Sequence, residues 1–518
     1  MARARNRWGW GFDDAAIGAD DARAAAPGVA AMFGFGSTEV AEPVALPALP
    51  APRVRGPRAM AAISTDDDHD RASHSLGKSY VDAIRGFRGE YEHVVDLVAR
   101  PGDEREVEAV LEWAADANVA VIPYGGGTSV VGGVEPRIPA SYDGALALDL
   151  GRLDRVLEVD AVSRAARIQA GASGPGLEEQ LGAHELTMRF YPQSFELSTL
   201  GGWIATRAGG HFATGPTHVD DVVESVRAIT PSGTWASRRL PGSGAGPSPD
   251  RLLLGSEGIL GVITEAWVRV QPRPGHRASR TVRFASFADG AEAVRAVVQS
   301  GLRPAGCRLI DALEAQQTGA GEGDRAVLVL GYESTDHPVD HELARALELC
   351  RDHAGEPDEP SARAAGAWRE AFLRMPYLRD MLLRLGIVSE TFESAVTWDR
   401  FPAFHDQVVG ATRASLGEPC RVTCRFTHVY PDGPAPYFTV IAPARPGDEI
   451  AQWREAKRAA SDAILAAGGT ITHHNAVGRD HRPWYDVQRP DPFAAALRAA
   501  KAAVDPQGIL NPGVLLDP

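Results

Sequence analysis

A glycine-rich segment is the residue pattern with the clearest chemical potential in this chain. Pro123-Tyr-Gly-Gly-Gly-Thr-Ser-Val-Val-Gly-Gly follows a short apolar run that predicts a buried strand. Three consecutive glycines let the backbone turn sharply and bring its N–H groups close to an anion, and two hydroxyls add donors. The segment lacks the ending of a Walker loop, and no helix follows it as a Gly-x-Gly-x-x-Gly motif requires. We expect a pyrophosphate-binding loop, with an ordinary glycine turn as the alternative.

Two later segments combine glycines, small hydroxylated residues and apolar residues in the same way. They run from Pro192 to Gly210 and from Gly255 to Thr264. Such a composition suits the close approach of backbone to a flat polar ring system. Each segment alone is weak evidence, but three of them together favour the pyrophosphate interpretation over a glycine turn.

Four further side chains are suited to catalysis, although each has an ordinary structural explanation. Arg308 alone is best explained as a surface arginine, and Tyr437 as a half-buried strand tyrosine. His473 and His474 would point to opposite faces of an extended segment, so only one of them needs to face a site. A metal site is the weaker option for this pair, because the HExxH spacing is absent.

The elements that position these residues alternate between short strands and helices from about residue 94, an order typical of an α/β or α+β domain. Before them, residues 1–60 are rich in Ala, Pro and Gly, and residues 43–57 predict an extended proline-rich arm. In the first block we expect strands at 94–98, 119–124, 146–150, 156–159, 166–170 and 258–270, and helices at 79–88, 103–117 and 174–184.

A second block follows the boundary signal Pro272-Arg-Pro-Gly. The Pro/Gly/Ser stretch at 240–250 predicts a surface loop within the first block. In the second block we expect strands at 281–284, 307–310, 325–331, 420–430 and 437–444, helices at 287–301, 450–467 and 492–504, and helical segments within 340–385.

Length and composition exclude several classes of protein. With 518 residues, 44% of them hydrophobic and 23% charged, the chain is globular and has room for roughly two to four domains. Its 53 basic and 68 acidic residues give a net charge of −15, which disfavours a nucleic-acid partner. Four cysteines are too few for a disulfide scaffold and favour a reducing compartment. Without a signal peptide or a run of about 18 apolar residues, we expect a cytoplasmic protein with at most peripheral membrane contact.

Several long motifs resemble the vanillyl-alcohol-oxidase type of FAD flavoprotein and, within it, the alkyldihydroxyacetonephosphate synthases. The three glycine-containing segments match the FAD-contacting loops of that family at 123–130, 194–207 and 257–263. Beyond a short amino-terminal match, the resemblance covers about residue 70 to the end. Its other motifs are Trp8-Gly-Trp-Gly, Arg308-Leu-Ile-Asp, Ser389-Glu-Thr-Phe-Glu-Ser-Ala-Val-Thr-Trp-Asp-Arg, Thr472-His-His-Asn-Ala-Val-Gly and Val504-Asp-Pro.

The resemblance implies an α+β fold with a two-part PCMH-type FAD-binding domain, an antiparallel-sheet cap domain for the substrate and C-terminal helices that return to the flavin. The implied boundaries are 1–78 for the arm, 79–274, 275–448 and 449–518. A homodimer is expected, as is non-covalent FAD, because no histidine or cysteine lies in 123–133. The implied FAD-binding residues are Pro123, Tyr124, Gly125, Gly126, Gly127, Thr128, Ser129, Val130, Pro192, Ser194, Ser198, Thr199, Gly202, Thr206, Arg207, Glu257, Gly258, Gly261, Val262 and Ile263.

The same resemblance gives roles to the catalytic candidates. Tyr437 matches the family's base, a phenol that nearby cations could help to lose its proton. Arg308 matches an active-site arginine that clamps an anionic head group, and His473 and His474 match histidines that orient it and stabilise charge.

Two departures from the family stand out. Its third histidine is replaced by Asn475, which can hydrogen-bond but cannot carry a catalytic proton. Residues 214–221, Thr-Gly-Pro-Thr-His-Val-Asp-Asp, stand where the family has Tyr-Gly before an acidic pair, so we expect a different substrate geometry.

Three functions compete. The first is exchange of the acyl chain of acyl-dihydroxyacetone phosphate for a fatty alcohol in ether-lipid synthesis, with flavin N5 as a covalent handle and no net redox change. The second is a dehydrogenase or oxidase of a 2-hydroxy acid, with Arg308 on the carboxylate and hydride transfer to N5; Asn475 slightly favours it. The third is flavin binding without turnover, against which the intact Arg308, Tyr437 and His474 argue.

Overall fold

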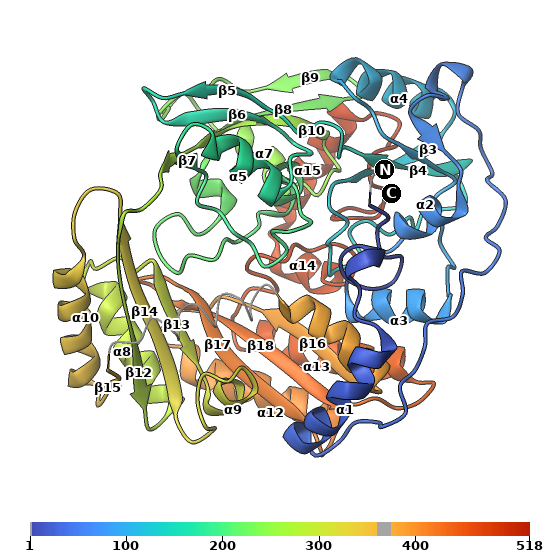
Figure 1. The fold of residues 1–518 in the computed structure, drawn as a ribbon. Helices are drawn as coiled ribbons and strands as arrows, with labels where there is room; N and C mark the ends of the chain where they lie inside the picture. Colours follow the sequence, from blue (N-terminus) through green and yellow to red (C-terminus); the bar gives the residue numbers. More distant parts are fainter. Residues whose placement is uncertain (1–2, 360–373) are drawn as a thin grey trace.

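The strands of the chain form three main sheets, and the two smaller ones lie above the largest in the view of Figure 1. The computed structural model describes residues 3–359 and 374–518. Among these residues no helix combines the length and the apolar character that a membrane crossing requires. All four cysteines are buried free thiols.

The first sheet has four strands in the order β1-β2-β4-β3, and β2 and β3 both run parallel to β4. The helix between β2 and β3, α4, begins after Asp103, whose side chain accepts a hydrogen bond from the Glu106 N–H. Its apolar face shares one core cluster with the sheet, as its helical period predicts. The bounds are β1 Ser64–Thr65, β2 Leu97–Ala99, β3 Val119–Tyr124, β4 Gly144–Asp149, α2 Asp68–Ser73, α3 Tyr80–Arg88 and α4 Glu104–Asp116.

The second sheet is antiparallel, in the order β5-β6-β10-β8-β9. The short helix α6 packs tightly beside it: a Cβ on Gly201 would lie 2.7 Å from the Cβ of Ala170, so only glycine permits this approach. The bounds are β5 Val156–Asp160, β6 Ala165–Gln169, β8 Val223–Thr230, β9 Gly233–Ala236, β10 Val262–Arg269, α5 Gly174–Gly182, α6 Leu200–Thr206 and α7 Asp250–Leu253, with the small β7–β11 pair at Leu186–Thr187 and Gln271–Pro272.

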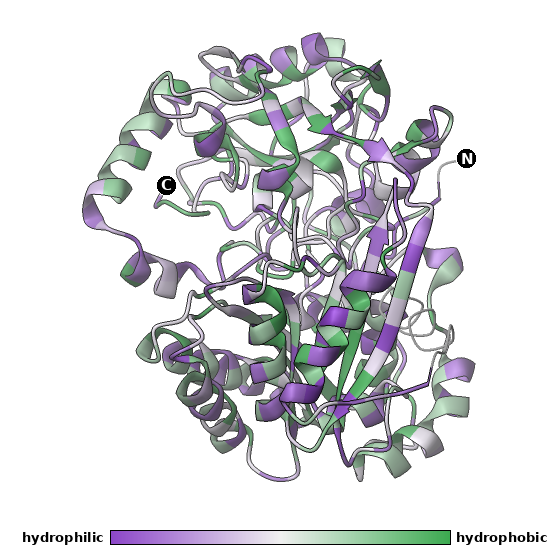
Figure 2. Cartoon of the chain, turned by 90° about the vertical axis from the view of Figure 1, so that its left-hand side faces the viewer, coloured by the Kyte–Doolittle hydropathy of each residue, from purple (hydrophilic) through white to green (hydrophobic). Residues whose placement is uncertain are grey.

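The third sheet has seven antiparallel strands in the order β15-β12-β14-β13-β17-β18-β16. Leu309, Cys424 and Phe438 from three of its strands join one core cluster with α8, α10, α12 and α13, so these helices cover one face. Figure 2 shows hydrophobic and hydrophilic residues mixed along most helices, as amphipathic packing requires. The bounds are β12 His276–Phe284, β13 Gly306–Ile310, β14 Ala326–Ser334, β15 Glu356–Pro357, β16 Ile387–Glu393, β17 Arg421–Val429, β18 Pro434–Pro443, α8 Phe287–Gln299, α9 Ala312–Gln317, α10 Asp340–Asp352, α12 Phe401–Leu416 and α13 Glu449–Ala466.

The other face of this sheet is turned toward the first two sheets. Because side chains alternate along a strand, the residues next to the core positions point the opposite way. Arg308, Arg425 and Tyr437 are such neighbours, on β13, β17 and β18, and all three are buried. The fold therefore collects polar side chains from three strands on the face opposite the helical layer.

The carboxy-terminal segment returns to the first two sheets. α14 (Arg482–Gln488) and α15 (Asp491–Val504) follow α13, and the chain then lies against β3, where the Val121 N–H donates to the Ile509 carbonyl at 2.8 Å. Leu516 joins the core of the second sheet.

Most expected elements form within a few residues of their predicted ends, and several elements form where none was expected, among them β8, β16 and α12. The strand expected at 258–270 begins only at Val262, because a tight turn with Gly258 at φ +79° precedes it. The helical segments expected within 340–385 form as α10 and again at residues 374–384, with the short strand β15 after α10, and the part at 360–373 lies outside the described residues. The helix α1, Ala19–Phe33, forms within the Ala/Pro/Gly-rich start, where no helix was expected.

Candidate active site

A cavity of about 410 Å³ lies between the glycine-rich segments and the open face of the seven-stranded sheet. Parts of all three glycine-containing segments line it, and so do β16, β17 and β18. The carboxy-terminal segment that contains His474 and Asn475 completes the wall. The fold thus brings the candidate cofactor-binding and catalytic residues to one cavity.

The glycine-rich segment lies too close to its neighbours for any larger residue. A Cβ on Gly126 would lie 2.2 Å from the Leu197 carbonyl oxygen, and one on Gly127, at φ +67°, would lie 1.9 Å from the Tyr124 hydroxyl. From the other side, Arg5 donates to the carbonyl oxygens of Gly126 at 2.7 Å and Gly125 at 3.2 Å. These contacts hold the segment in a fixed shape beside the cavity, as a backbone cradle for an anion requires.

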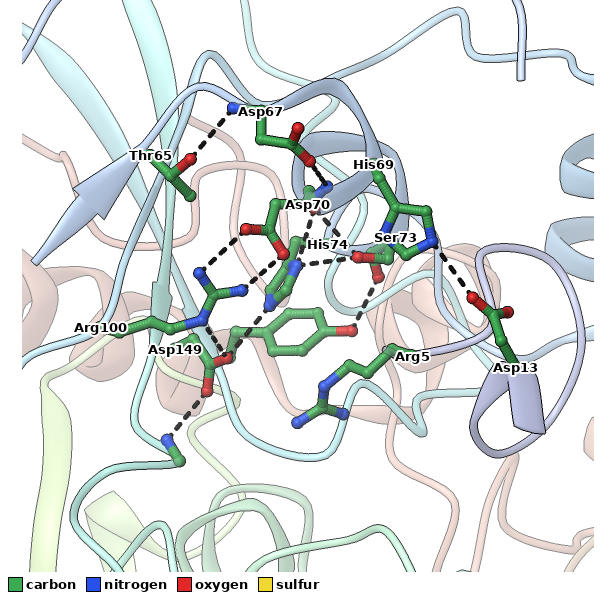
Figure 3. Close-up of polar contacts among 12 residues, drawn as sticks. Arg5, Asp13, Thr65, Asp67, His69, Asp70, Ser73, His74, Arg100 and Asp149 are labelled. Atoms are coloured by element: carbon green, nitrogen blue, oxygen red, sulfur yellow. Dashed lines mark hydrogen bonds and ion pairs between the residues drawn. The ribbon is translucent and has the colours of Figure 1, made fainter. Parts of the chain in front are cut away.

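A buried polar network lies next to this cradle and begins at Tyr124, the residue before the three glycines. The Tyr124 hydroxyl donates to the Ser73 carbonyl at 3.0 Å, and the adjacent His74 ring lies 3.1 Å from the Asp149 carboxylate, which Arg100 also contacts (Figure 3). Burial alone would raise the pKa of Asp149, but the His74 hydrogen bond and the charge of Arg5 lower it to about 2. An ionised Asp149 therefore anchors the end of β4 next to the cradle.

Nearly all of the twenty expected FAD-binding residues line the cavity. The exceptions are Arg207, which pairs with Asp220 near the surface, and Val262, which is buried in the core of the first sheet. Glu257 lines the cavity and accepts from the N–H groups of Val477 at 2.9 Å and Gly478 at 2.8 Å, and burial raises its pKa to about 7. This carboxyl group ties the carboxy-terminal segment to the third glycine-containing segment.

Tyr437 lies in the cavity wall with its hydroxyl donating to Thr391 Oγ1 at 2.9 Å. Burial raises its pKa above the ordinary value, although Arg425, whose Cζ lies 3.9 Å from the ring centroid, acts in the opposite direction. We expected nearby cations to lower the pKa of Tyr437. Arg425 does act in that direction, but burial outweighs it and the pKa is raised. Tyr437 is a neutral phenol in this structure.

The two buried arginines occupy different places. Arg425 lines the cavity and pairs with the buried carboxylate of Glu314. Arg308, expected as the anion clamp, is not among the lining residues; its Nη2 lies 3.4 Å from His211 Nδ1. Burial and the charge of Arg425 lower the pKa of Arg308 to about 9. Arg425 is therefore a cationic group of the cavity wall, which Lys78 and Arg379 also line, whereas Arg308 is buried outside that lining.

Four histidines cluster beside the two arginines. The Nδ1 atoms of His473 and His474 are 2.9 Å apart, His473 Nε2 lies 3.0 Å from His218 Nε2, and the His428 ring centroid is 5.2 Å from that of His474. Burial lowers the pKa of His218, lowers those of His428 and His473 well below the ordinary value, and lowers that of His474 to about 3. All four rings are neutral at physiological pH.

One buried carboxylate shapes the histidine segment. Glu393, at the end of β16, accepts from the backbone N–H groups of His473, His474 (3.2 Å) and Asn475 (2.9 Å) and from Thr472 Oγ1 at 2.8 Å. The turn that presents the two rings is therefore built around a single side chain.

Sequence reasoning missed several members of this site. His218 comes from the segment that departs from the family pattern, and its link to His473 shows that this segment adjoins the histidine pair. Arg425, His428 and Glu393 lie in strands whose polar residues interrupt apolar runs. Polar residues within an apolar strand predict buried polar groups, but the pattern does not predict which residues or cavity these groups contact.

Comparisons with known proteins agree with this geometry. Residues 95–237 match the family described as "FAD binding domain", and residues 273–515 match "FAD linked oxidases, C-terminal domain". An alkyldihydroxyacetonephosphate synthase of Dictyostelium discoideum is 30% identical over 482 residues, which cover 87% of this chain and 78% of the relative. A glycolate oxidase subunit of Bacillus subtilis is 25% identical, over 82% of this chain and 89% of the relative.

Solved structures show the same fold. A structure of alkyldihydroxyacetonephosphate synthase is similar with a TM-score of 0.77 and 27% identity, covering 92% of this chain and 88% of that one. The structure of p-cresol methylhydroxylase, at 14% identity and a TM-score of 0.72, shares the fold over 89% of this chain and 95% of its own. The α+β architecture with an antiparallel-sheet second domain is thereby confirmed.

Proposed function

The chain belongs to the alkyldihydroxyacetonephosphate synthase family, and on that premise we propose that it exchanges the acyl chain of acyl-dihydroxyacetone phosphate for a fatty alcohol. It is an FAD-dependent enzyme. The residues present fit that cofactor, because the cradle around Gly126 and Gly127 has room for backbone only and leaves the adjoining cavity open to a ligand. When bound, FAD would supply an electrophilic ring nitrogen for the exchange.

The observation that carries the proposal is the division of the cavity wall into an apolar part and a polar part. Phe33, Leu382 and Ile441 belong to one apolar cluster and line the cavity, as Leu378 also does, and this apolar part suits a long hydrocarbon chain. Arg425 lines the part that also holds Tyr437 and the histidines. A short 2-hydroxy acid is too small to contact the apolar part, whereas a substrate with an acyl chain and an anionic head group would contact both parts.

We assign the proton transfer to Tyr437. In the neutral phenol the hydroxyl donates to Thr391 Oγ1 at 2.9 Å; when the phenol loses its proton to solvent before the substrate binds, the guanidinium of Arg425 beside the ring stabilises the phenolate. The phenolate then takes the proton next to the substrate ketone. Arg425, backed by Arg308, attracts the phosphate to this end of the cavity, where the fixed positive charge favours an anionic group.

The neutral histidines position the head group. His474, whose ring lies 6.0 Å from that of Tyr437 and nearly parallel to it, can donate or accept a hydrogen bond without adding charge. Asn475 supports the same segment but cannot carry a proton. We therefore place the orienting role on His473 and His474 and no proton transfer on position 475.

The test uses purified FAD-loaded protein under anaerobic conditions. Incorporation of labelled hexadecanol into the ether product, with the flavin oxidised at the end, supports the exchange. Bleaching of the flavin by glycolate or D-lactate without exchange contradicts it and selects the dehydrogenase. The observation that keeps this second function under test is the position of His474 in the cavity wall, where its unprotonated ring can accept a hydrogen bond from the hydroxyl of a hydroxy acid.

Finer features complete the proposal. We expect a cytoplasmic homodimer with at most peripheral membrane contact, and domain boundaries at 78, 274 and 448. We also expect non-covalent FAD, since residues 123–133 contain no histidine or cysteine. Acid precipitation should give a colourless pellet and a yellow supernatant; a yellow pellet contradicts non-covalent binding.

A further inference from the structure

Three histidines from two distant segments meet at the wall of the cavity. His428 lies on β17, and His473 and His474 follow α13. One ring nitrogen of each lies within 4.8 Å of those of the other two. In a tetrahedral zinc site with Zn–N bonds of about 2.0–2.1 Å, the ligand nitrogens lie about 3.3 Å apart, so the three rings need to shift by no more than about 1.5 Å relative to one another to bind an ion.

One ring nitrogen of His428 has a lone pair that no hydrogen bond from the described residues uses. Its Nε2 lies 2.8 Å from the Gly210 carbonyl oxygen, which can only accept, so the proton is on Nε2. Its Nδ1 is buried and has no hydrogen-bond partner among the described residues. His428 itself is 1% exposed. A buried nitrogen without a partner, on a ring fixed by a carbonyl, is the arrangement that a metal-ligating histidine has.

The Nδ1 atoms of the other two rings lie so close together that a proton or a cation must lie between them. His473 Nδ1 and His474 Nδ1 are 2.9 Å apart, so either one carries a proton or a cation lies between them. The opposite nitrogen of His473, Nε2, lies 2.8 Å from the Tyr430 hydroxyl. An outer partner of this kind orients the ring and leaves Nδ1 available as a ligand.

We propose that His428, His473 and His474 form a binding site for a divalent transition-metal ion of the zinc type. Three neutral imidazoles suit Zn²⁺ and its neighbours, whereas Mg²⁺ and Ca²⁺ prefer oxygen ligands. Since His428 and His474 line the cavity, the fourth position of the ion is open on the cavity side, to water or to an anionic oxygen. A search for the HExxH spacing does not detect this site, because His428 lies 45 positions before His473 in the sequence and is brought close to it by strand β17.

Equilibrium dialysis of the FAD-loaded, chelator-treated protein against ZnCl₂ tests the site. The wild type should retain about one zinc ion per chain. His428→Gln and His474→Gln should each weaken zinc binding at least about tenfold. The matched control is His337→Gln, because His337 is an exposed histidine with Asp336 and Glu342 nearby and would report surface binding. No zinc retained by the wild type, or equal loss in the control, overturns the proposal.

A second measurement needs no substitution and therefore does not depend on the variants folding. The X-ray absorption spectrum of the zinc-loaded wild type should show three imidazole ligands at about 2.0 Å. A first shell of oxygen atoms overturns the proposal. Both measurements are made without substrate, so a failure of the exchange reaction leaves their outcome unaffected, and the reverse also holds.

Discussion

Arg425 and Tyr437 are direct cross-strand partners on β17 and β18, and the Arg425 Cζ lies 3.9 Å from the centre of the Tyr437 ring. The register of one strand pair thus places a buried guanidinium against the face of the proposed catalytic phenol. Burial favours the neutral phenol and Arg425 favours the phenolate, so the acidity of Tyr437 depends on a balance of two opposed effects.

Tyr437→Phe should abolish the exchange reaction while FAD stays bound. The substitution removes the hydroxyl that moves the proton, and positioned acid–base groups contribute at least about 100-fold to rate. The FAD-binding cradle lies on other segments and should be unaffected. The measurement is kcat for hexadecanol exchange together with the FAD content of the purified variant. Near-normal turnover would remove Tyr437 from the mechanism.

Arg308→Ala should raise KM and lower kcat, with a combined loss of about tenfold or more in kcat/KM. Arg308 lies behind Arg425, so its charge strengthens the potential at the anionic end of the cavity and keeps the head group aligned. Arg308→Lys, which keeps the charge but loses the planar fork, should recover part of KM. An unchanged KM in Arg308→Ala would place this residue away from the anion.

Glu393→Gln should lower kcat about tenfold to 100-fold without loss of FAD. One carboxylate oxygen accepts from Thr472 and from the N–H groups of His474 and Asn475, and the other accepts from the His473 N–H; glutamine keeps a single acceptor oxygen, so its NH₂ group faces at least one of these donors without accepting from it. The histidine turn should then shift, and small displacements of positioning groups reduce rate strongly.

The control for that variant is Glu455→Gln, which removes a carboxylate from an exposed pair with Arg445. It should leave kcat unchanged, because exposed ion pairs contribute little. If Glu393→Gln turned over as fast as this control, the positioning role would be wrong.

Gly126→Ala should prevent FAD binding. A Cβ at this position would lie 2.2 Å from the Leu197 carbonyl oxygen and 2.7 Å from the Ser198 Cα, so the cradle must open to accept it. Gly242→Ala is the matched control, since its Cβ meets no described atom within 4 Å. Flavin absorbance per chain is the measurement, and equal FAD content in both variants would contradict the close packing.

The local sequence pattern was sufficient to predict elements whose conformation depends mainly on neighbouring residues. The strand Val119–Tyr124 forms with its predicted bounds, because a short apolar run ended by glycines has few alternatives. The helix α1 was missed because Pro27 and Gly28 lie within it, and both residues normally interrupt a helix. Alanine and packing against the second domain override that signal, as tertiary context often does.

The set of residues that surrounds Tyr437 and the histidine pair could not be predicted from the local sequence pattern. Alternation along β17 would place His428 on the core face with Cys424 and Phe426, but a register shift between Phe426 and His428 interrupts it, and His428 lines the cavity. The pairing of His218 with His473 joins positions 255 residues apart. Likewise, the neutral state of Tyr437 follows from burial, which depends on the whole fold.

Glu257 should make stability depend on pH in a direction opposite to most carboxylates. Burial raises its pKa in the folded protein to about 7, from 4.5 in the unfolded chain, so the folded state holds the proton more tightly. Its stabilising contribution is therefore fully present below pH 4.5 and is lost as pH rises through 7. A pKa difference of one corresponds to about 1.4 kcal/mol, which makes the total loss about 3 kcal/mol.

Urea unfolding of the FAD-loaded protein between pH 5 and 8 measures this effect, with Glu257→Gln as the comparison. The variant has no proton to lose at this position, so the difference in unfolding free energy between wild type and variant should shift against the wild type as pH rises, most steeply between pH 5 and 7, and level off above pH 7. The other titrating groups are common to both proteins and cancel in the difference. Parallel curves across the whole range would show that Glu257 ionises as easily in the folded chain as in the unfolded one, and that its two backbone donors, Val477 and Gly478, fully offset its burial.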